Sequence, residues 1–139
     1  MAPFALFLRA LRLRNGMSQS ELALATGYEQ AHMSSLELGT KNPTDEFLAR
    51  LTQAFELAEE EQAEMIAEVA ASKTRYALPP DLPTEKFRFC AELWEKMDRI
   101  QPATVAAMHS LLKLEDQLAV RVKHQPDRLQ RKQPKEAQM

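Results

Sequence analysis

The chain has 139 residues and a formal net charge of −2, and 45% of its residues are hydrophobic while 27% are charged. This length suits one ordinary domain, or a small domain with an appendage. No stretch approaches eighteen consecutive apolar residues, so we expect no transmembrane helix and no membrane partner. The N-terminus is apolar first and basic afterwards, the reverse of a signal peptide, and is interpreted as a mature first helix.

The composition predicts an all-α protein. Ala, Leu, Glu, Gln and Met are abundant, Val and Ile are sparse, and there are only three glycines. Straight-chain residues and alanine are the strongest helix formers, whereas β-branched residues favour strands. The single cysteine, Cys90, excludes a disulfide framework and a cysteine-based metal cluster, so we expect a cytoplasmic protein.

Charge is distributed unevenly along the chain. Residues 1–57 are close to neutral, residues 58–99 carry ten acidic and six basic side chains, and residues 100–139 carry four acidic and seven basic ones. A protein that binds DNA non-specifically is usually far more basic. Any contact with DNA must therefore come from a small patch and from backbone groups.

The first two helices are marked by an apolar stripe and a cap. The stripe has the i, i+3, i+4, i+7 spacing of one helix face and consists of Phe4, Phe7, Leu8 and Leu11. Asn15-Gly16 is expected to end this helix. Ser18, with Glu21 three residues later, predicts a capping box at the start of a second helix, which Gly27 ends.

Two further helices complete the predicted N-terminal bundle. A third runs from Glu29 or Gln30 to about Leu38, with Met33 and Leu36 facing inward. A fourth opens at Pro43-Thr44, and its apolar face consists of Phe47, Leu48, Leu51, Ala54 and Phe55. Leu57 closes the unit, so we predict a DNA-binding domain over residues 1–57.

The rest of the chain is predicted to be helical and then disordered. Residues 58–73 form a connecting helix, the proline-rich residues 74–83 a linker, residues 84–123 a helical dimerisation or regulatory region, and residues 124–139 a disordered basic tail. In the 84–123 region the apolar positions are Phe87, Cys90, Leu93, Trp94, Met97, Val105, Met108, Leu111, Leu112, Leu118 and Val122. Two helices cannot bury such faces alone, so they must pack on another part of the chain or on a second copy.

Catalytic and metal-binding patterns are missing from the sequence. The three histidines, His32, His109 and His124, are too scattered for a metal site, and Cys90 lies on an apolar helix face as expected for a core thiol. No nucleophile with a base, glycine-rich phosphate loop or carboxylate pair is present. We therefore predict no enzyme, no metal and no cofactor.

Residues 18–43 have the pattern of a helix-turn-helix: two short helices, a glycine between them, and small residues on the second. Residues from about 8 to 57 resemble the Cro/C1-type (XRE) family of phage and bacterial regulators, which implies a compact lambda-repressor-like bundle. The matching residues are Leu11-Arg12, Ser18-Gln19, Leu22-Ala23, Gly27-Tyr28, Met33, Leu36-Glu37, Gly39, Pro43, Leu48, Leu51 and Leu57.

The resemblance implies roles for individual residues. Gln30, Ala31 and Ser35 occupy positions that read bases, and His32 and Ser34, on the same outer face or its rim, are also predicted to read bases. The positions that contact phosphate are Gln19, Thr40, Lys41 and Asn42. Arg12 and Glu37 occupy positions that form an internal ion pair. Independently, a glutamine pairs well with adenine, and alanine can touch a thymine methyl group.

Two residues depart from the family pattern. Glu29 stands near the N-cap of the third helix, where a serine or threonine is more usual, and its charge would repel phosphates. Leu38 replaces a commonly polar residue. These departures weaken the expected affinity for one half-site and make dimerisation more necessary.

We interpret the chain as a sequence-specific DNA-binding transcriptional regulator, a phage- or prophage-type repressor that binds a palindromic operator as a homodimer. A bacterial or phage-encoded protein of this kind is expected at the nucleoid. Two alternatives remain. One is a helix-turn-helix antitoxin that holds a toxin through residues 58–123, and the other is a protein-interaction module without DNA binding.

Overall fold

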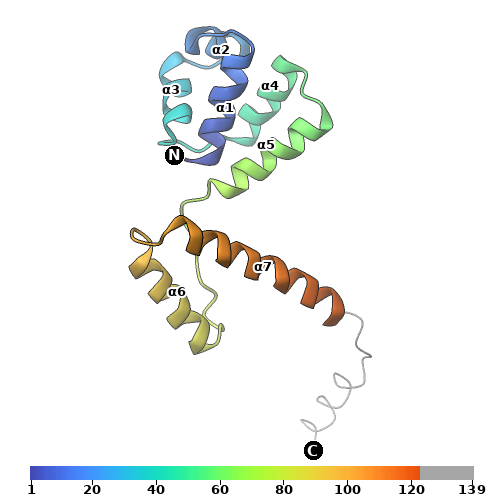
Figure 1. Cartoon of the computed structure of the whole chain (residues 1–139). Helices are drawn as coiled ribbons and strands as arrows, with labels where there is room; N and C mark the ends of the chain where they lie inside the picture. Colours follow the sequence, from blue (N-terminus) through green and yellow to red (C-terminus); the bar gives the residue numbers. More distant parts are fainter. Residues whose placement is uncertain (123–139) are drawn as a thin grey trace, which may run out of the picture. The chain divides into compact units, whose positions relative to one another are not determined.

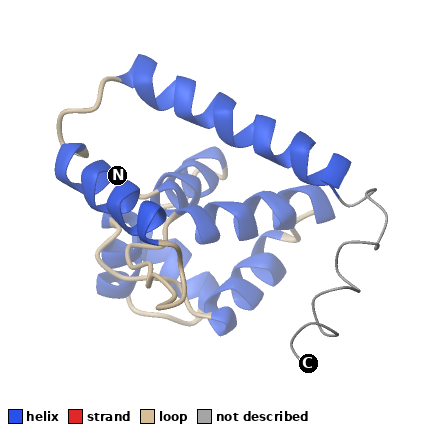
Figure 2. Ribbon diagram, turned by 90° about the horizontal axis from the view of Figure 1, so that it is seen from below, coloured by secondary structure: helices blue, strands red, loops and turns tan. Residues whose placement is uncertain are grey.

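The computed structural model describes residues 1–122, with side chains described as far as residue 119 (Figure 1). The described residues contain seven α-helices and no strand, so the all-α prediction is confirmed (Figure 2). The chain divides into an N-terminal unit, Met1–Ala77, and a C-terminal unit, Leu78–Met139. The predicted tail, residues 124–139, lies outside the described residues. None of the described helices is both long enough and apolar enough to cross a bilayer.

Five helices form the N-terminal unit: α1 (Pro3–Arg14), α2 (Gln19–Thr26), α3 (Gln30–Leu38), α4 (Asp45–Phe55) and α5 (Glu59–Ala71). Helix α1 packs against α3 on one side and α5 on another, while α2 packs against α3 and α4 (Figure 1). The largest fully buried side chains are Phe4, Leu8, Leu22, Met33, Leu36, Phe47 and Leu51. All seven were expected at apolar positions of the first four helices.

The ends of α2 are fixed by local chemistry. The Ser18 hydroxyl accepts from the backbone N–H of Glu21, and the Glu21 carboxylate accepts from that of Ser18, which is the predicted capping box. Gly27 ends the helix with φ +76°, in the left-handed region. A Cβ added there would lie 2.8 Å from Arg50 Nη1. Because that atom is the end of a flexible side chain that can move aside, glycine is needed here for the backbone conformation.

Helix α1 begins with help from a distant residue. Its N-cap, Ala2, offers no side-chain acceptor, and Pro3 follows at the first position. The backbone N–H of Phe4 donates instead to the hydroxyl of Ser72, at 2.8 Å. Because Ser72 is the C-cap residue of α5, this buried bond joins the beginning of α1 to the end of α5.

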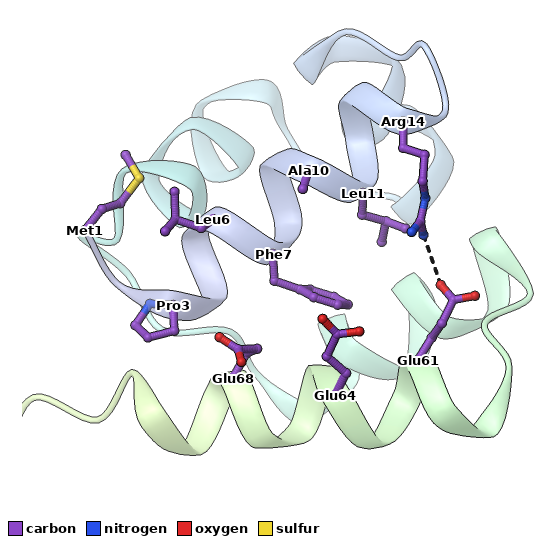
Figure 3. A pocket seen from close by; sticks show the side chains of 10 residues that line it. All are labelled: Met1, Pro3, Leu6, Phe7, Ala10, Leu11, Arg14, Glu61, Glu64 and Glu68. Atoms are coloured by element: carbon purple, nitrogen blue, oxygen red, sulfur yellow. Dashed lines mark hydrogen bonds and ion pairs between the residues drawn. The ribbon is translucent and has the colours of Figure 1, made fainter. Parts of the chain in front are cut away.

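Helix α5 packs along α1 rather than standing apart from the bundle. Met65 is buried in the same core as the residues of the first four helices. An open groove remains between the two helices (Figure 3). Its α1 side is mostly apolar and its α5 side is acidic; the lining includes Leu6, Phe7, Ala10, Glu61, Glu64 and Glu68. Arg14 crosses one end and pairs with Glu61 at 3.0 Å.

The C-terminal unit contains α6 (Thr84–Lys96) and α7 (Pro102–Val122). None of the side chains described between residues 78 and 119 is buried. Cys90 is half-buried, so the expectation of a core thiol is not met. The physical reason is that α6 and α7 scarcely contact each other, which leaves the apolar face of α6 uncovered.

Candidate nucleic-acid interface

Helix α3 separates an apolar inner face from a small, polar outer face. Met33 and Leu36 are fully buried, as predicted. Gln30 and Ala31, at the start of the helix, are exposed. Ser34 and Ser35 are half-buried, which places them at the edge of the outer face. The outer surface therefore offers short side chains and one long amide, a shape that suits close approach to a groove of DNA.

A buried ion pair joins α1 to α3. Arg12 Nε donates to Glu37 Oε1 at 2.5 Å, and Arg12 Nη2 donates to Glu37 Oε2 at 3.1 Å. The remaining guanidinium nitrogen, Nη1, donates to the carbonyl of Met17 at 2.8 Å. Only 12% of the Arg12 side chain and 5% of the Glu37 side chain are exposed. This two-point geometry holds the two planes in one orientation.

The ionisation of Glu37 depends on these partners. Burial alone would raise the pKa of the carboxyl group, but the hydrogen bonds from Arg12 and Gln19 and the positive charge of Arg12 outweigh it. The pKa of Glu37 therefore lies below its ordinary value. The hydrogen bond to Glu37 correspondingly raises the pKa of Arg12. Both groups are charged at neutral pH.

The hydrogen bonds continue from this pair to the surface. Gln19 Nε2 donates to Glu37 Oε2 at 2.8 Å. Gln30 Nε2 in turn donates to Gln19 Oε1 at 3.2 Å. The side chains of α1, α2 and α3 are thereby linked in a continuous chain whose last member, Gln30, is exposed.

The Gln30 amide keeps most of its bonding capacity. A glutamine side chain has two N–H donors and a carbonyl acceptor, and only one donor is used within the protein. The second N–H and the carbonyl are the pair of groups that recognises adenine N7 and N6. Gln19 also keeps one amide N–H beyond its bond to Glu37.

Two hydroxyl donors near the interface are already engaged. Ser35 Oγ donates to the carbonyl of Ala31 at 3.0 Å, and Thr40 Oγ1 donates to that of Ser35 at 3.1 Å. Their oxygens can still accept a hydrogen bond, but a phosphate oxygen needs a donor. Lys41 and Asn42 are exposed in the loop after α3 and keep suitable donors.

His32 lies differently from the outward position that the sequence suggested. Its ring stacks on Tyr28, with centroids 4.9 Å apart, and meets the edge of Phe47. Within the described residues, its buried Nε2 has no hydrogen-bond partner. The geometry makes His32 a packing residue at the base of α3. Leu38, by contrast, is 64% exposed at the other end of the helix.

Sequence reasoning missed the support of the turn between α2 and α3. The Arg50 guanidinium donates to the carbonyl of Thr26 and to Glu46, and lies over the Tyr28 ring at 5.3 Å from its centroid. The i, i+4 spacing of Glu46 and Arg50 was the only sequence signal of this cluster. The cluster fixes the turn from which α3 starts.

Residues 3–65 match a family model described as a helix-turn-helix domain. This part of the chain is a helix-turn-helix domain of the Cro/C1 type. In the same comparisons, no curated protein and no solved structure matches the chain. Helix-turn-helix domains are characteristic of DNA-binding regulators. In this chain, α2 and α3 are the two helices of the motif. Within residues 1–122, no group of three His, Cys, Asp or Glu side chains is placed to hold a metal ion.

Proposed function

We propose that this protein is a transcriptional repressor, of phage or prophage type, that binds a palindromic operator as a homodimer. The observation that carries the proposal is the chain of contacts from Arg12 through Glu37 and Gln19 to the exposed amide of Gln30. An amide held in place before binding loses less conformational freedom on meeting a base. The helix-turn-helix domain supplies the geometry in which α3 enters the major groove.

Base reading is assigned to the outer face of α3. Gln30 reads an adenine, Ala31 contacts a thymine methyl group, and Ser35 accepts from a base amino group. Ser34 lies at the edge of this face, and His32 supports it by packing. Each good bidentate contact discriminates by about 1–3 kcal/mol.

Phosphate contacts are assigned to groups on both sides of the motif. Gln19 offers its free amide N–H and the backbone N–H at the start of α2, where the helix dipole favours an anion. Lys41 and Asn42 supply donors after α3, and Thr40 joins them by releasing its internal bond. With few basic residues, one domain binds weakly, so two domains on a symmetric site are needed.

The first experiment is a binding titration of the full chain on the DNA upstream of its own gene. Scrambled DNA of the same length is the control, and both are measured at two salt concentrations. Tight, salt-dependent binding to the upstream DNA, with a footprint of two symmetric half-sites, is the expected result. Absence of salt-dependent binding to any DNA contradicts the proposal.

The reading role of Gln30 has its own test. Gln30→Ala is expected to weaken operator binding by about 1–3 kcal/mol while leaving binding to random DNA unchanged. Gln53→Ala removes another exposed glutamine, from α4, and serves as the matched control. Equal loss on operator and random DNA for Gln30→Ala would refute base reading.

A protein partner is the second candidate, either as a toxin held by an antitoxin or in a module without DNA binding. The observation in its favour is the groove between α1 and α5, where Glu64 and Glu68 form no ion pair with any described residue (Figure 3). A basic protein that co-purifies with the unmodified chain, but not with a folded double variant Glu64→Lys/Glu68→Lys, would establish it.

A further inference from the structure

Glu29, the residue before α3, carries a carboxylate that has no role within the described structure. It is the N-cap residue of α3, but its side chain makes no capping hydrogen bond. It takes part in none of the ion pairs among the described residues, and its side chain is exposed. The backbone of Glu29 therefore starts the helix, while both carboxylate oxygens remain available to a ligand.

The position of Glu29 is fixed by its neighbours on both sides. The backbone N–H of Tyr28 donates to the carbonyl of Ala23 at 2.9 Å, which holds the turn against α2. On the other side, the side chain of Gln30 is bonded to that of Gln19 at 3.2 Å. A group that recognises a ligand is most precise when rigid elements carry it. The carboxylate thus extends from a well-held point of the motif.

Glu29 lies on the same side of the motif as the base-reading positions. A hollow in the surface beside the start of α3 brings them together. Its lining residues are Gly27, Tyr28, Glu29, Ala31, His32, Ser35 and Lys41. Ala31 and Ser35 are both assigned to base reading, so a base that meets them also comes close to the Glu29 carboxylate.

The charges around α3 make this carboxylate costly. In the segment from Gly27 to Asn42, the charged residues are Glu29, Glu37 and Lys41, and Glu37 is buried in its pair with Arg12. The exposed charges of Glu29 and Lys41 cancel, so this segment gains little from the attraction of phosphates. Tight binding to an operator therefore requires a specific contact that offsets the charge of Glu29.

A carboxylate fits one of the four base edges in the major groove. An ionised carboxylate can only accept hydrogen bonds. Guanine and thymine present acceptors in this groove, and adenine presents the acceptor N7 beside its amino group, so all three place a lone pair near the carboxylate. Cytosine presents its N4 amino group alone and is the base that glutamate recognises.

We propose that Glu29 is a specificity-determining residue that accepts a hydrogen bond from the N4 amino group of a cytosine beside the base pair read by Gln30. The inference rests on the proposed function and deepens it, because it adds a cytosine to the half-site. On other DNA the same carboxylate repels phosphates without this compensation. One side chain thereby supplies both an attractive and a repulsive element of specificity.

The test is a selection of double-stranded DNA from a randomised pool by the full chain and three variants. Glu29→Ala removes the carboxylate, and Glu29→Gln replaces it by an amide of similar shape. Glu60→Gln is the matched control, because it removes an exposed carboxylate from the first turn of α5. Neither change at Glu29 removes a capping hydrogen bond, so α3 is expected to stay folded.

The selected sequences are compared position by position. The unmodified chain and Glu60→Gln are expected to select the same sequences, with a C·G pair at one fixed position of each half-site. Glu29→Ala should lose the preference at that position alone. Glu29→Gln should change it from cytosine to adenine, because an amide pairs with N6 and N7 of adenine. Partial unfolding cannot produce a new preference, so this variant decides the question even if Glu29→Ala is less stable.

Titrations on two operators that differ only at this position measure the size of the effect. The unmodified chain is expected to bind the operator with C·G at least about fivefold more tightly than the one with T·A. For Glu29→Ala the two affinities should differ by less than about twofold.

Two results would overturn the inference. One is a Glu29→Ala variant with unchanged preference at every position. The other is a variant that binds all sequences more tightly by the same factor, which would reduce Glu29 to a repulsive charge. Failure of the proposed function is distinguishable, because the unmodified chain then selects no sequence from the pool.

Discussion

The two units of this chain are built from the same kinds of helix, yet they bury their apolar side chains very differently. In the N-terminal unit, helices of eight to thirteen residues surround a core in which seven large side chains are fully buried. In the C-terminal unit, a helix of 21 residues and one of 13 bury none of their described side chains. Helix length and amphipathic pattern therefore do not decide whether a segment is stable alone. What decides it is how many apolar helix faces pack against one another.

Removal of the Phe47 ring should have the largest effect on the stability of the N-terminal unit. Phe47 is fully buried and makes T-shaped contacts with the rings of Tyr28 and His32, so Phe47→Ala is expected to destabilise the N-terminal unit by about 3–5 kcal/mol. The loss should not depend on protein concentration, because the N-terminal unit has a core of its own. Chemical denaturation at two concentrations measures both points. A concentration-dependent midpoint for the N-terminal transition would contradict the division.

The buried ion pair should behave differently from the exposed one. Arg12→Met leaves the Glu37 carboxylate buried without its main partner and is expected to cost about 3 kcal/mol. Arg12→Met with Glu37→Met removes both charges and should lose clearly less. In the C-terminal unit, Lys96→Ala opens the exposed pair with Glu92 and should leave stability unchanged. Equal losses for the single and double N-terminal variants would show that packing of Arg12, and not its charge, is what counts.

Acid should weaken the N-terminal unit through Glu37. The pKa of this group is lower in the folded protein than its ordinary value of 4.5, so its contribution is present above that pH and is lost as the pH falls through the folded value. Glu37→Gln removes this titration and should flatten the acid side of the stability profile. Denaturant midpoints of the unmodified chain and of Glu37→Gln are measured between pH 6 and pH 3. The two plots of stability against pH are expected to differ in slope below about pH 5. Parallel profiles would mean that another carboxylate dominates.

His32→Phe should sharpen the distinction between packing and reading. A phenyl ring keeps the stacking on Tyr28 and the contact with Phe47, and it removes the buried Nε2 that lacks a partner. We expect the N-terminal unit to gain about 1 kcal/mol, with operator affinity unchanged. Thermal unfolding and the DNA titration measure the two effects. A gain in stability with a loss of operator affinity would place His32 in contact with a base.

The smallest expected effect lies at the end of α4. Glu56 has φ +49° and is the one non-glycine residue with positive φ in the described structure. Glu56→Gly should stabilise the N-terminal unit by about 0.5–1 kcal/mol, because glycine reaches this conformation without strain. The change in the denaturation midpoint is small but measurable. A loss of stability would show that the side chain of Glu56 makes a contribution larger than the strain.

The predictable parts of this structure are those set by neighbours in sequence. The Ser18 and Glu21 cap, the glycine turns and the inward faces of α1 and α4 follow from spacing and local propensity. The T-shaped contact between His32 and Phe47 was not predictable, because Phe47 comes from another helix. Nor was the left-handed Glu56, since a glutamate carries no signal for that conformation.

The candidate interface shows the same limit. The resemblance named the Arg12 and Glu37 pair and the position of Gln30, whereas the link through Gln19 depends on three helices meeting at one point. The roles of the base-reading and phosphate-contacting residues stay predictions until DNA binding is measured.

The bond between Phe4 and Ser72 has a mechanical consequence. The chain leaves the N-terminal unit just after Ser72, so tension in the following segment is first felt at the end of α5 and, through this bond, at the beginning of α1. The end of α3 lies beside this junction, because Leu36 and Gly39 line a small cleft together with Phe4 and Ser72. Tension at the end of α5 is therefore passed through the start of α1 to the end of α3, the second helix of the motif.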